Sequence, residues 1–67
     1  MKYEINTLVA TVIKKDDAQK GAVGAIVGIQ KGATDQEDLY LVELFNVVNH
    51  LHYQLWYNKN EIYAIQQ

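Results

Sequence analysis

Apolar and polar residues alternate in blocks along the chain, and each apolar block has the composition of a strand. Residues 7–14 are rich in β-branched side chains and no helix cap precedes them, which predicts a first strand. Polar residues at 15–21 end in a glycine and predict an exposed loop. A second strand is expected over 22–30, followed by a polar hairpin connection over 31–38.

Glycine punctuates the second predicted strand. Gly21, Gly24 and Gly28 lie within a run of small and β-branched residues. Branched side chains favour a pleated strand, while a glycine inside a strand marks a bulge or a close approach of two backbones. The run therefore predicts the tightly bent strand of a small barrel, with Gly24 at a bulge or a close approach.

Residues 39–57 fit two periodicities. With period two, Tyr40, Val42 and Leu44 share one face and alternate with their neighbours. With helical spacing, Asp38 is an N-cap and one apolar stripe forms, which consists of Leu41, Leu44, Val48, Leu51 and Leu55. Aromatic and β-branched residues are frequent here, so two strands are favoured over one helix. The turn chemistry between two strands would come from Asn46, Asn49 and His50.

The two ends of the chain are expected to form short elements. Residues 1–6 are expected to be a frayed lead-in. At the other end, Asn58 is followed three positions later by Glu61, the spacing of a capping box. Too few residues follow for a long helix, so the spacing predicts a single helical turn and then a last short strand over 62–65.

The length of 67 residues fits one domain, 1–67, and limits the size of its core. A chain this short buries only ~60% of its unfolded surface, so most of its 49% hydrophobic residues are needed inside. A deep substrate pocket would remove core volume. The chain also lacks serine and cysteine, the common acyl-transfer nucleophiles, and therefore has no disulfides or thiolate metal sites. We expect no enzyme, no cofactor and no small-molecule substrate.

No segment has the composition of a signal peptide or a membrane helix. The only apolar run near the start covers residues 8–13 and is interrupted by Thr11. A signal peptide needs ~7–15 apolar residues and a membrane helix ~20. The chain is therefore expected to be soluble and cytoplasmic, with no membrane partner.

The charge balance disfavours nucleic acid as a partner. The formal net charge is −2, and all six basic residues are lysines, without the arginines that read guanine edges and phosphates. Lys14, Lys15 and Lys20 lie near each other in the sequence. Asp16 and Asp17 lie between them and offset much of their field.

Three groups of residues have a chemical interpretation, and each has a simpler structural one. His50 and His52 share one face of a strand, but a metal site needs further ligands that the sequence does not supply. The acidic residues at 35, 37 and 38 lack the alternating ligands and closing glutamate of a calcium loop. The glycines at 21, 24 and 28 are not followed by the lysine or helix start of a phosphate-binding loop. We expect no metal site and no cofactor site.

Three short motifs resemble those of a known family. Residues 21–27, Gly-Ala-Val-Gly-Ala-Ile-Val, look like the second-strand signature of short bacterial proteins of unknown function with SH3-like folds. Residues 40–44, Tyr-Leu-Val-Glu-Leu, are similar to that family's third strand, and residues 61–65 resemble its closing segment. The resemblance spans residues 7–65 and implies an all-β, five-stranded SH3-like barrel with one short helical turn before the last strand.

The same layout recurs in KOW-type ribosomal and transcription modules and in the small barrel subunit of photosystem I. The chain departs from the family at one point. The family places an Asp-Gly type turn after the third strand, whereas residues 45–50 are more apolar and contain no glycine. The family pattern implies no catalytic residues.

Aromatic residues are the strongest functional signal in the sequence. Tyr53, Trp56, Tyr57 and Tyr63 fall within eleven positions, and a barrel this small cannot enclose all of their rings. Exposed apolar patches mark contacts with other proteins. We therefore expect an interaction surface, whose members are Leu41, Phe45, Tyr53 and Trp56.

The function that this surface predicts is protein binding. The chain would be a small bacterial interaction module that binds itself or another protein, as an accessory subunit or as an antitoxin- or immunity-type partner. The alternative is a nucleic-acid-associated module similar to KOW barrels. A positive field around the lysines at 14, 15, 20 and 31 would favour that alternative.

Overall fold

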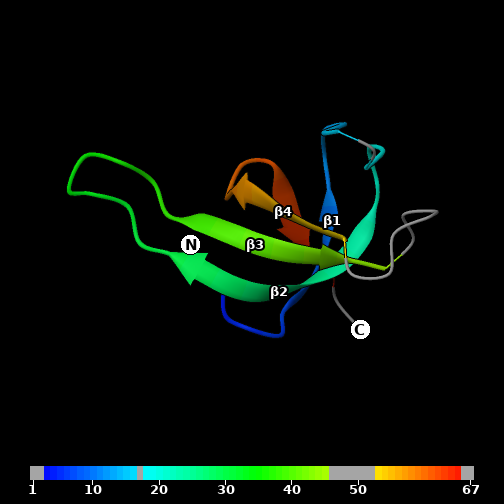
Figure 1. Cartoon of the computed structure of the whole chain (residues 1–67), viewed down its shortest axis with the longest axis horizontal. Helices are drawn as coiled ribbons and strands as arrows, with labels where there is room; N and C mark the ends of the chain where they lie inside the picture. The colour runs from blue at the N-terminus through cyan, green and yellow to red at the C-terminus, as the bar shows by residue number, and fades with distance from the viewer. Residues whose placement is uncertain (1–2, 17, 46–52, 66–67) are drawn as a thin grey trace.

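The computed structural model describes residues 3–16, 18–45 and 53–65, which form one antiparallel sheet of five strands. The strands are β1 (Leu8–Thr11), β2 (Val23–Gln30), β3 (Leu39–Leu44), β4 (Tyr53–Asn58) and β5 (Ile62–Ala64). Their order across the sheet is β4-β3-β2-β1-β5 (Figure 1). The prediction of an all-β fold with five strands is confirmed. Within the described ranges, no helix is long and apolar enough to cross a membrane.

The described parts of the ambiguous segment 39–57 contain two strands, β3 and β4, and no helix. β3 and β4 pair in a regular antiparallel register that runs from Leu39 opposite Asn58 to Leu44 opposite Tyr53. Period two is therefore correct for the described strands, and the predicted helix is wrong there. Val48 and Leu51 of its apolar stripe lie outside the described residues.

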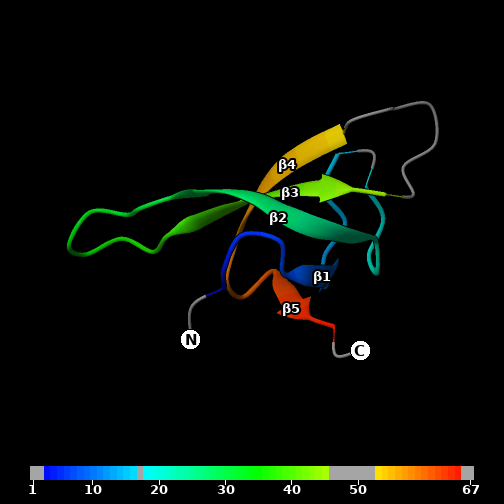
Figure 2. The same cartoon turned by 90° about the horizontal axis from the view of Figure 1, so that it is seen from below.

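The sheet bends along β2. This strand has eight residues, and it pairs with β1 through its first part and with β3 along most of its length. The register with β3 shifts between Ile26 and Gly28, so Val27 is the extra residue of a β-bulge. A bulge increases the local twist and bends the strand that carries it. In Figure 2, β2, β3 and β4 lie above β1 and β5, and β2 contributes to both parts of the bent sheet.

One face of the sheet encloses the core. Tyr40, Val42 and Leu44 of β3 are buried in the alternation that period two predicts. Apolar residues of every strand and of the loop after β1 join them, so the buried cluster consists of Val9, Ala18, Ala22, Ile26, Tyr40, Val42, Leu44, Tyr57 and Ile62. We call this side of the sheet the inner face and the opposite side the outer face.

Gly24 lies at a close approach of two backbones. A Cβ atom built on Gly24 would clash with the carbonyl oxygen of Glu43 and would lie 2.9 Å from Cγ1 of Val42. β2 can therefore pack this tightly against β3 only with glycine at this position. The predicted close approach at Gly24 is confirmed, and the bulge lies three residues further on, at Val27.

The loop 15–21 is partly buried, so the prediction of an exposed loop is wrong for its centre. Ala18 is fully buried in the core. Thr11, which is also buried, anchors the loop: its hydroxyl donates to the carbonyl of Gln19 and accepts from the amide of Ala22, both at 3.1 Å. In a domain this small, loop atoms complete the core because the strands alone enclose little volume.

Residues 3–6 of the predicted lead-in pack on the sheet. The Tyr3 ring meets the Tyr40 ring edge-on, with the ring centroids 5.4 Å apart. The Tyr3 hydroxyl donates to the carbonyl of Ile62 at 3.4 Å, and the amide of Asn6 donates to the carbonyl of Ile26 at 2.8 Å. This segment therefore covers part of the core.

Residues 58–61 form a β-turn, so the predicted helical turn is wrong. The amide of Glu61 donates to the carbonyl of Asn58 at 3.0 Å, which closes a four-residue turn between β4 and β5. Two side-chain contacts nevertheless form in this turn: Glu61 Oε1 accepts from the Asn58 amide and Asn58 Oδ1 accepts from the Asn60 amide, both at 2.9 Å. No helix follows because the next residues pair with β1 as β5.

Candidate functional site

Exposed apolar side chains gather on the outer face of β3 and β4. Leu39, Leu41 and Phe45 alternate with the buried residues of β3 and therefore share its outer side. Trp56 of β4 lies directly opposite Leu41 in the register, and it is 41% exposed. Phe45, just after β3, is 60% exposed.

Leu41 is the centre of a row that crosses three strands. Its partner on β2 is Gly28 and its partner on β4 is Trp56. Gly28 has no side chain to cover Leu41, and the next residue back along β2 is the exposed bulge residue Val27. We call the set of apolar residues on this side the outer apolar face, which consists of Val27, Leu39, Leu41, Phe45 and Trp56.

A polar pair divides the outer apolar face. Glu43 lies opposite Gln54, and the Gln54 amide group donates to the Glu43 carboxylate at 3.4 Å. Side chains on one face of a strand recur every second residue, so this pair lies between the Leu41–Trp56 row and Phe45. Apolar side chains with polar groups among them are typical of protein–protein interfaces.

Three of the four residues predicted for the interaction surface lie on the outer face: Leu41, Phe45 and Trp56. Tyr53 does not join them, because it lies opposite the buried Leu44 and packs against the core. Tyr53 and Trp56 are three positions apart, and residues an odd number apart lie on opposite faces of a regular strand. The sequence therefore contains the signal that separates them.

Val27 and Leu39 belong to the outer apolar face although the sequence prediction did not include them. Leu39 is two positions from Leu41, so alternation along β3 is enough to find it. Val27 follows the buried Ile26, so alternation along β2 places it on the outer side as well, and the bulge shifts the register only from Gly28 onward. Tyr63 is exposed on β5, at the other end of the strand order.

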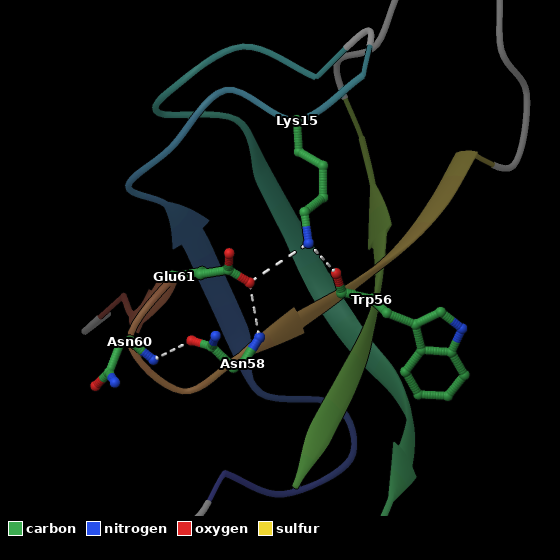
Figure 3. A network of polar contacts seen from close by, with 5 residues as sticks. All are labelled: Lys15, Trp56, Asn58, Asn60 and Glu61. Atoms are coloured by element: carbon green, nitrogen blue, oxygen red, sulfur yellow. Dashed lines mark hydrogen bonds and ion pairs between the residues drawn. The ribbon is translucent and has the colours of Figure 1, made fainter. Parts of the chain in front are cut away.

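Lys15 links the free side of β4 to the turn before β5. Its ammonium group donates to the carbonyl oxygen of Trp56 at 2.7 Å and lies 3.4 Å from Oε1 of Glu61 (Figure 3). The same group lies 4.8 Å from the centroid of the Tyr57 ring, a cation–π distance. Figure 3 shows the Trp56 ring pointing away from this network. The network therefore holds the Trp56 backbone in place and leaves its ring available on the outer side.

The Tyr57 hydroxyl is buried and has no hydrogen-bond partner among the described residues. Burial raises the pKa of Tyr57, and the charges of Tyr53, Glu61 and Asp16 raise it further. The hydroxyl therefore keeps its proton in the folded protein beyond the pH at which a free tyrosine ionises.

The acidic hairpin tip between β2 and β3 has a structural role. Asp38 Oδ1 accepts from the Gly32 amide at 2.9 Å, and its Oδ2 lies 3.5 Å from Nζ of Lys31. These contacts tie the two sides of the connection together. Asp35 and Glu37 are exposed at the tip.

Over 3–16, 18–45 and 53–65, no three His, Cys, Asp or Glu side chains gather as a metal-binding group. The histidine pair and the expected turn lie outside the described residues; these positions are Asn46, Asn49, His50 and His52.

Comparisons with protein-family models, with curated proteins and with solved structures give no match for this chain.

Proposed function

We propose that this protein is a small SH3-like barrel that binds another protein chain through the outer apolar face. The strand order β4-β3-β2-β1-β5 and the bent β2 support the barrel. A small barrel of this kind acts by covering or positioning its partner. The role that fits best is a cytoplasmic accessory subunit or an antitoxin- or immunity-type partner.

The exposed ring of Trp56 beside Leu41 is the observation that carries this proposal. A chain this short needs most of its apolar side chains in the core, so few remain for its surface. Here the strand register holds the largest side chain of the protein on the outside, where 41% of Trp56 meets solvent. Covering apolar area is favourable by ~25 cal/mol per Å², so a partner that covers this row gains affinity. Tryptophan is also among the residue types that dominate binding energy at interfaces.

Ion pairs support protein over nucleic acid as the partner. Two of the four lysines on which the KOW-like alternative depends are paired: Lys15 lies 3.4 Å from Glu61, and Lys31 lies 3.5 Å from Asp38. Each carboxylate offsets part of the positive field that a phosphate backbone needs. Nucleic-acid binding would weaken steeply as salt is added, whereas binding through the outer apolar face would change little.

The test compares three baits in a lysate of the native host: the wild type, Trp56→Ala and Tyr63→Ala. Tyr63 is the matched control because it is an exposed aromatic on β5, away from the outer apolar face. We expect a partner that the wild type and Tyr63→Ala capture and Trp56→Ala loses, because a hot-spot ring contributes on the order of 2 kcal/mol. Circular dichroism must show that Trp56→Ala stays folded. Equal capture by all three baits would contradict the proposal.

A further inference from the structure

We propose that the partner of the outer apolar face presents an arginine to the Glu43 carboxylate, between apolar side chains that cover Trp56 on one side and Phe45 on the other. The partner is then a segment of a different protein with one basic residue among apolar ones. This inference rests on the proposed function, since it names the chemistry that the same surface selects.

Glu43 lies in the middle of the outer apolar face. On the outer side of β3 it is two positions from Leu41 and two positions from Phe45, which places it ~7 Å from each along the strand. Its neighbours across the sheet are Ala25 of β2 and Gln54 of β4. A partner that covers both Leu41 and Phe45 must therefore cover the carboxylate between them.

The three strands of this face carry one negative charge and no positive charge. β2, β3 and β4 contain no lysine or arginine, and Glu43 is their single acidic residue. Two lysines outside these strands are engaged elsewhere. Lys31 lies 3.5 Å from Asp38 in the hairpin connection. Lys15 lies 3.4 Å from Glu61 at the turn before β5. The charge of the face therefore favours a partner that is basic at this point.

Covering a carboxylate is unfavourable unless the partner supplies donors and charge. Glu43 is half-buried in the free protein, and the Gln54 amide group donates to its Oε2 at 3.4 Å. A carboxylate has about four acceptor sites, so it can accept further donors beside this one. Removing its remaining water costs free energy, which a cation at hydrogen-bond distance offsets and an apolar side chain does not. A partner with a cation at this point is therefore selected over one that is apolar throughout.

Arginine fits this position better than lysine does. Its planar fork can donate two parallel hydrogen bonds to one carboxylate, and its face stacks on aromatic rings. Trp56 is the diagonal neighbour of Glu43 across β3 and β4, at the ~7–8 Å that such neighbours have. A guanidinium bound to Glu43 is therefore within reach of the Trp56 ring. A second copy of this chain does not supply the group, because all six of its basic residues are lysines.

The test starts with a library of random peptides displayed on phage, selected on the immobilised wild type and in parallel on Trp56→Ala. Peptides enriched on the wild type over Trp56→Ala bind through the outer apolar face. We expect an arginine flanked by apolar residues to be more frequent among them than in the starting library. The most enriched peptide is synthesised together with a matched peptide in which citrulline, which has nearly the same shape and no charge, replaces the arginine.

Fluorescence anisotropy then measures the affinity of both peptides for the wild type, Glu43→Gln and Glu37→Gln. Glu43→Gln removes the charge and keeps the shape, and Glu37→Gln is the matched control at the exposed hairpin tip. We expect the arginine peptide to bind Glu43→Gln about tenfold or more weakly than the wild type, and Glu37→Gln to change its affinity by less than about threefold. The citrulline peptide should bind the wild type and Glu43→Gln within about threefold of each other, because a direct charge pair couples the two substitutions.

Each other outcome overturns the inference. Face-binding peptides without a basic residue reject the arginine and keep the protein-binding role. An arginine peptide that Glu43→Gln and Glu37→Gln weaken equally senses only the net charge. Equal losses on Glu43→Gln for the arginine and citrulline peptides exclude a direct pair. A selection in which no peptide prefers the wild type to Trp56→Ala also rejects the inference, and the proposed function then depends on the lysate experiment.

Carbon-13 NMR of the wild type decides the matter if Glu43→Gln fails to fold. The carboxyl resonance of Glu43 should shift when the arginine peptide is added, because the guanidinium binds that group. The citrulline peptide should shift it much less at the same fraction bound. Equal shifts with the two peptides would overturn the pairing.

Discussion

At Gly24 and Tyr57, both on the inner face of the sheet, a single atom determines which side chain the position accepts. Gly24 has no side chain because the carbonyl of Glu43 occupies the place of its Cβ atom. The hydroxyl of Tyr57 is buried away from water, and no described residue forms a hydrogen bond with it. A substitution at either position therefore tests a specific contact.

Gly24→Ala should lower the free energy of unfolding by roughly 1–3 kcal/mol, because the added Cβ clashes with the Glu43 carbonyl and β2 must move away from β3. Gly28→Ala is the matched control in the same strand. Its Cβ would lie 3.4 Å from Leu41 Cβ, an ordinary contact, so its cost should be within ~0.5 kcal/mol. Urea denaturation of the three proteins measures the difference. Equal midpoints for the two variants would show that the close approach at Gly24 is not what limits packing.

Tyr57→Phe should raise the free energy of unfolding at pH 7 by on the order of 1 kcal/mol, because it removes a buried hydroxyl without a partner and keeps the ring. The Lys15 contact with the ring face, at 4.8 Å, does not need the hydroxyl. Chemical denaturation measures the change. A loss of stability comparable to that of a disrupted core contact would mean that the hydroxyl is satisfied in solution.

The same residue predicts how stability depends on alkaline pH. Burial raises the pKa of Tyr57 in the folded protein, whereas in the unfolded chain it ionises near its ordinary pKa of about 10. Above that pH the unfolded state binds fewer protons than the folded state, so stability is fully present below it and is lost as pH rises toward the folded pKa. Denaturation at pH 7 and pH 11 should show a larger loss for the wild type than for Tyr57→Phe. Parallel losses would contradict the raised pKa.

Among the elements, the turn between β4 and β5 is the place where the local sequence predicts a helix and pairing with β1 produces a strand instead. Glu61 makes its capping-box contact with the Asn58 amide, whereas Asn58 Oδ1 accepts from the amide of Asn60 and not from that of Glu61. The helix that usually follows does not form, because the amide of Val12 bonds to the Glu61 carbonyl and the next residues pair with β1. The capping-box spacing therefore predicts one of its two hydrogen bonds here but not the element after it.

Glu61→Ala should destabilise the protein by about 1 kcal/mol, the usual cost of a lost cap, because the Asn58 amide loses its acceptor and Lys15 loses its ion-pair partner. Glu61→Gln keeps an oxygen for the Asn58 amide and loses only the charge. Its cost should be less than half as large, since a partly exposed ion pair contributes little. Thermal or urea denaturation separates the two variants. If glutamine were as damaging as alanine, the ion pair with Lys15 would be the main term.

The strands themselves were predictable from the residues, and their ends were not. β-branched and aromatic residues with period two identified β3 and β4. The first strand was expected over 7–14, but β1 spans only Leu8–Thr11. Ala18 likewise became a core residue through contacts with distant strands. Strand ends and loop burial depend on partners far away in the sequence.

At the scale of the whole molecule, the bent sheet buries one face and leaves an apolar row on the other. The sequence indicated Leu41, Phe45 and Trp56, and alternation alone would have added Leu39 and removed Tyr53. Alternation with the buried Ile26 would also have added Val27, whereas the bulge beside it exists only in the pairing of β2 with β3. The adjacency of Leu41 and Trp56 likewise depends on the β3–β4 register. Alternation along each strand thus predicts which residues face outward, whereas the pairing of the strands determines which of them are neighbours.

Acrylamide quenching of tryptophan fluorescence tests the role of the outer apolar face most directly, because Trp56 is the single tryptophan of the chain. In the free protein, the partly exposed ring is open to the quencher. When the chain binds its partner, we expect quenching to fall and the emission to shift to shorter wavelength. A complex that forms with unchanged quenching and emission would contradict the account, because its interface would not include Trp56.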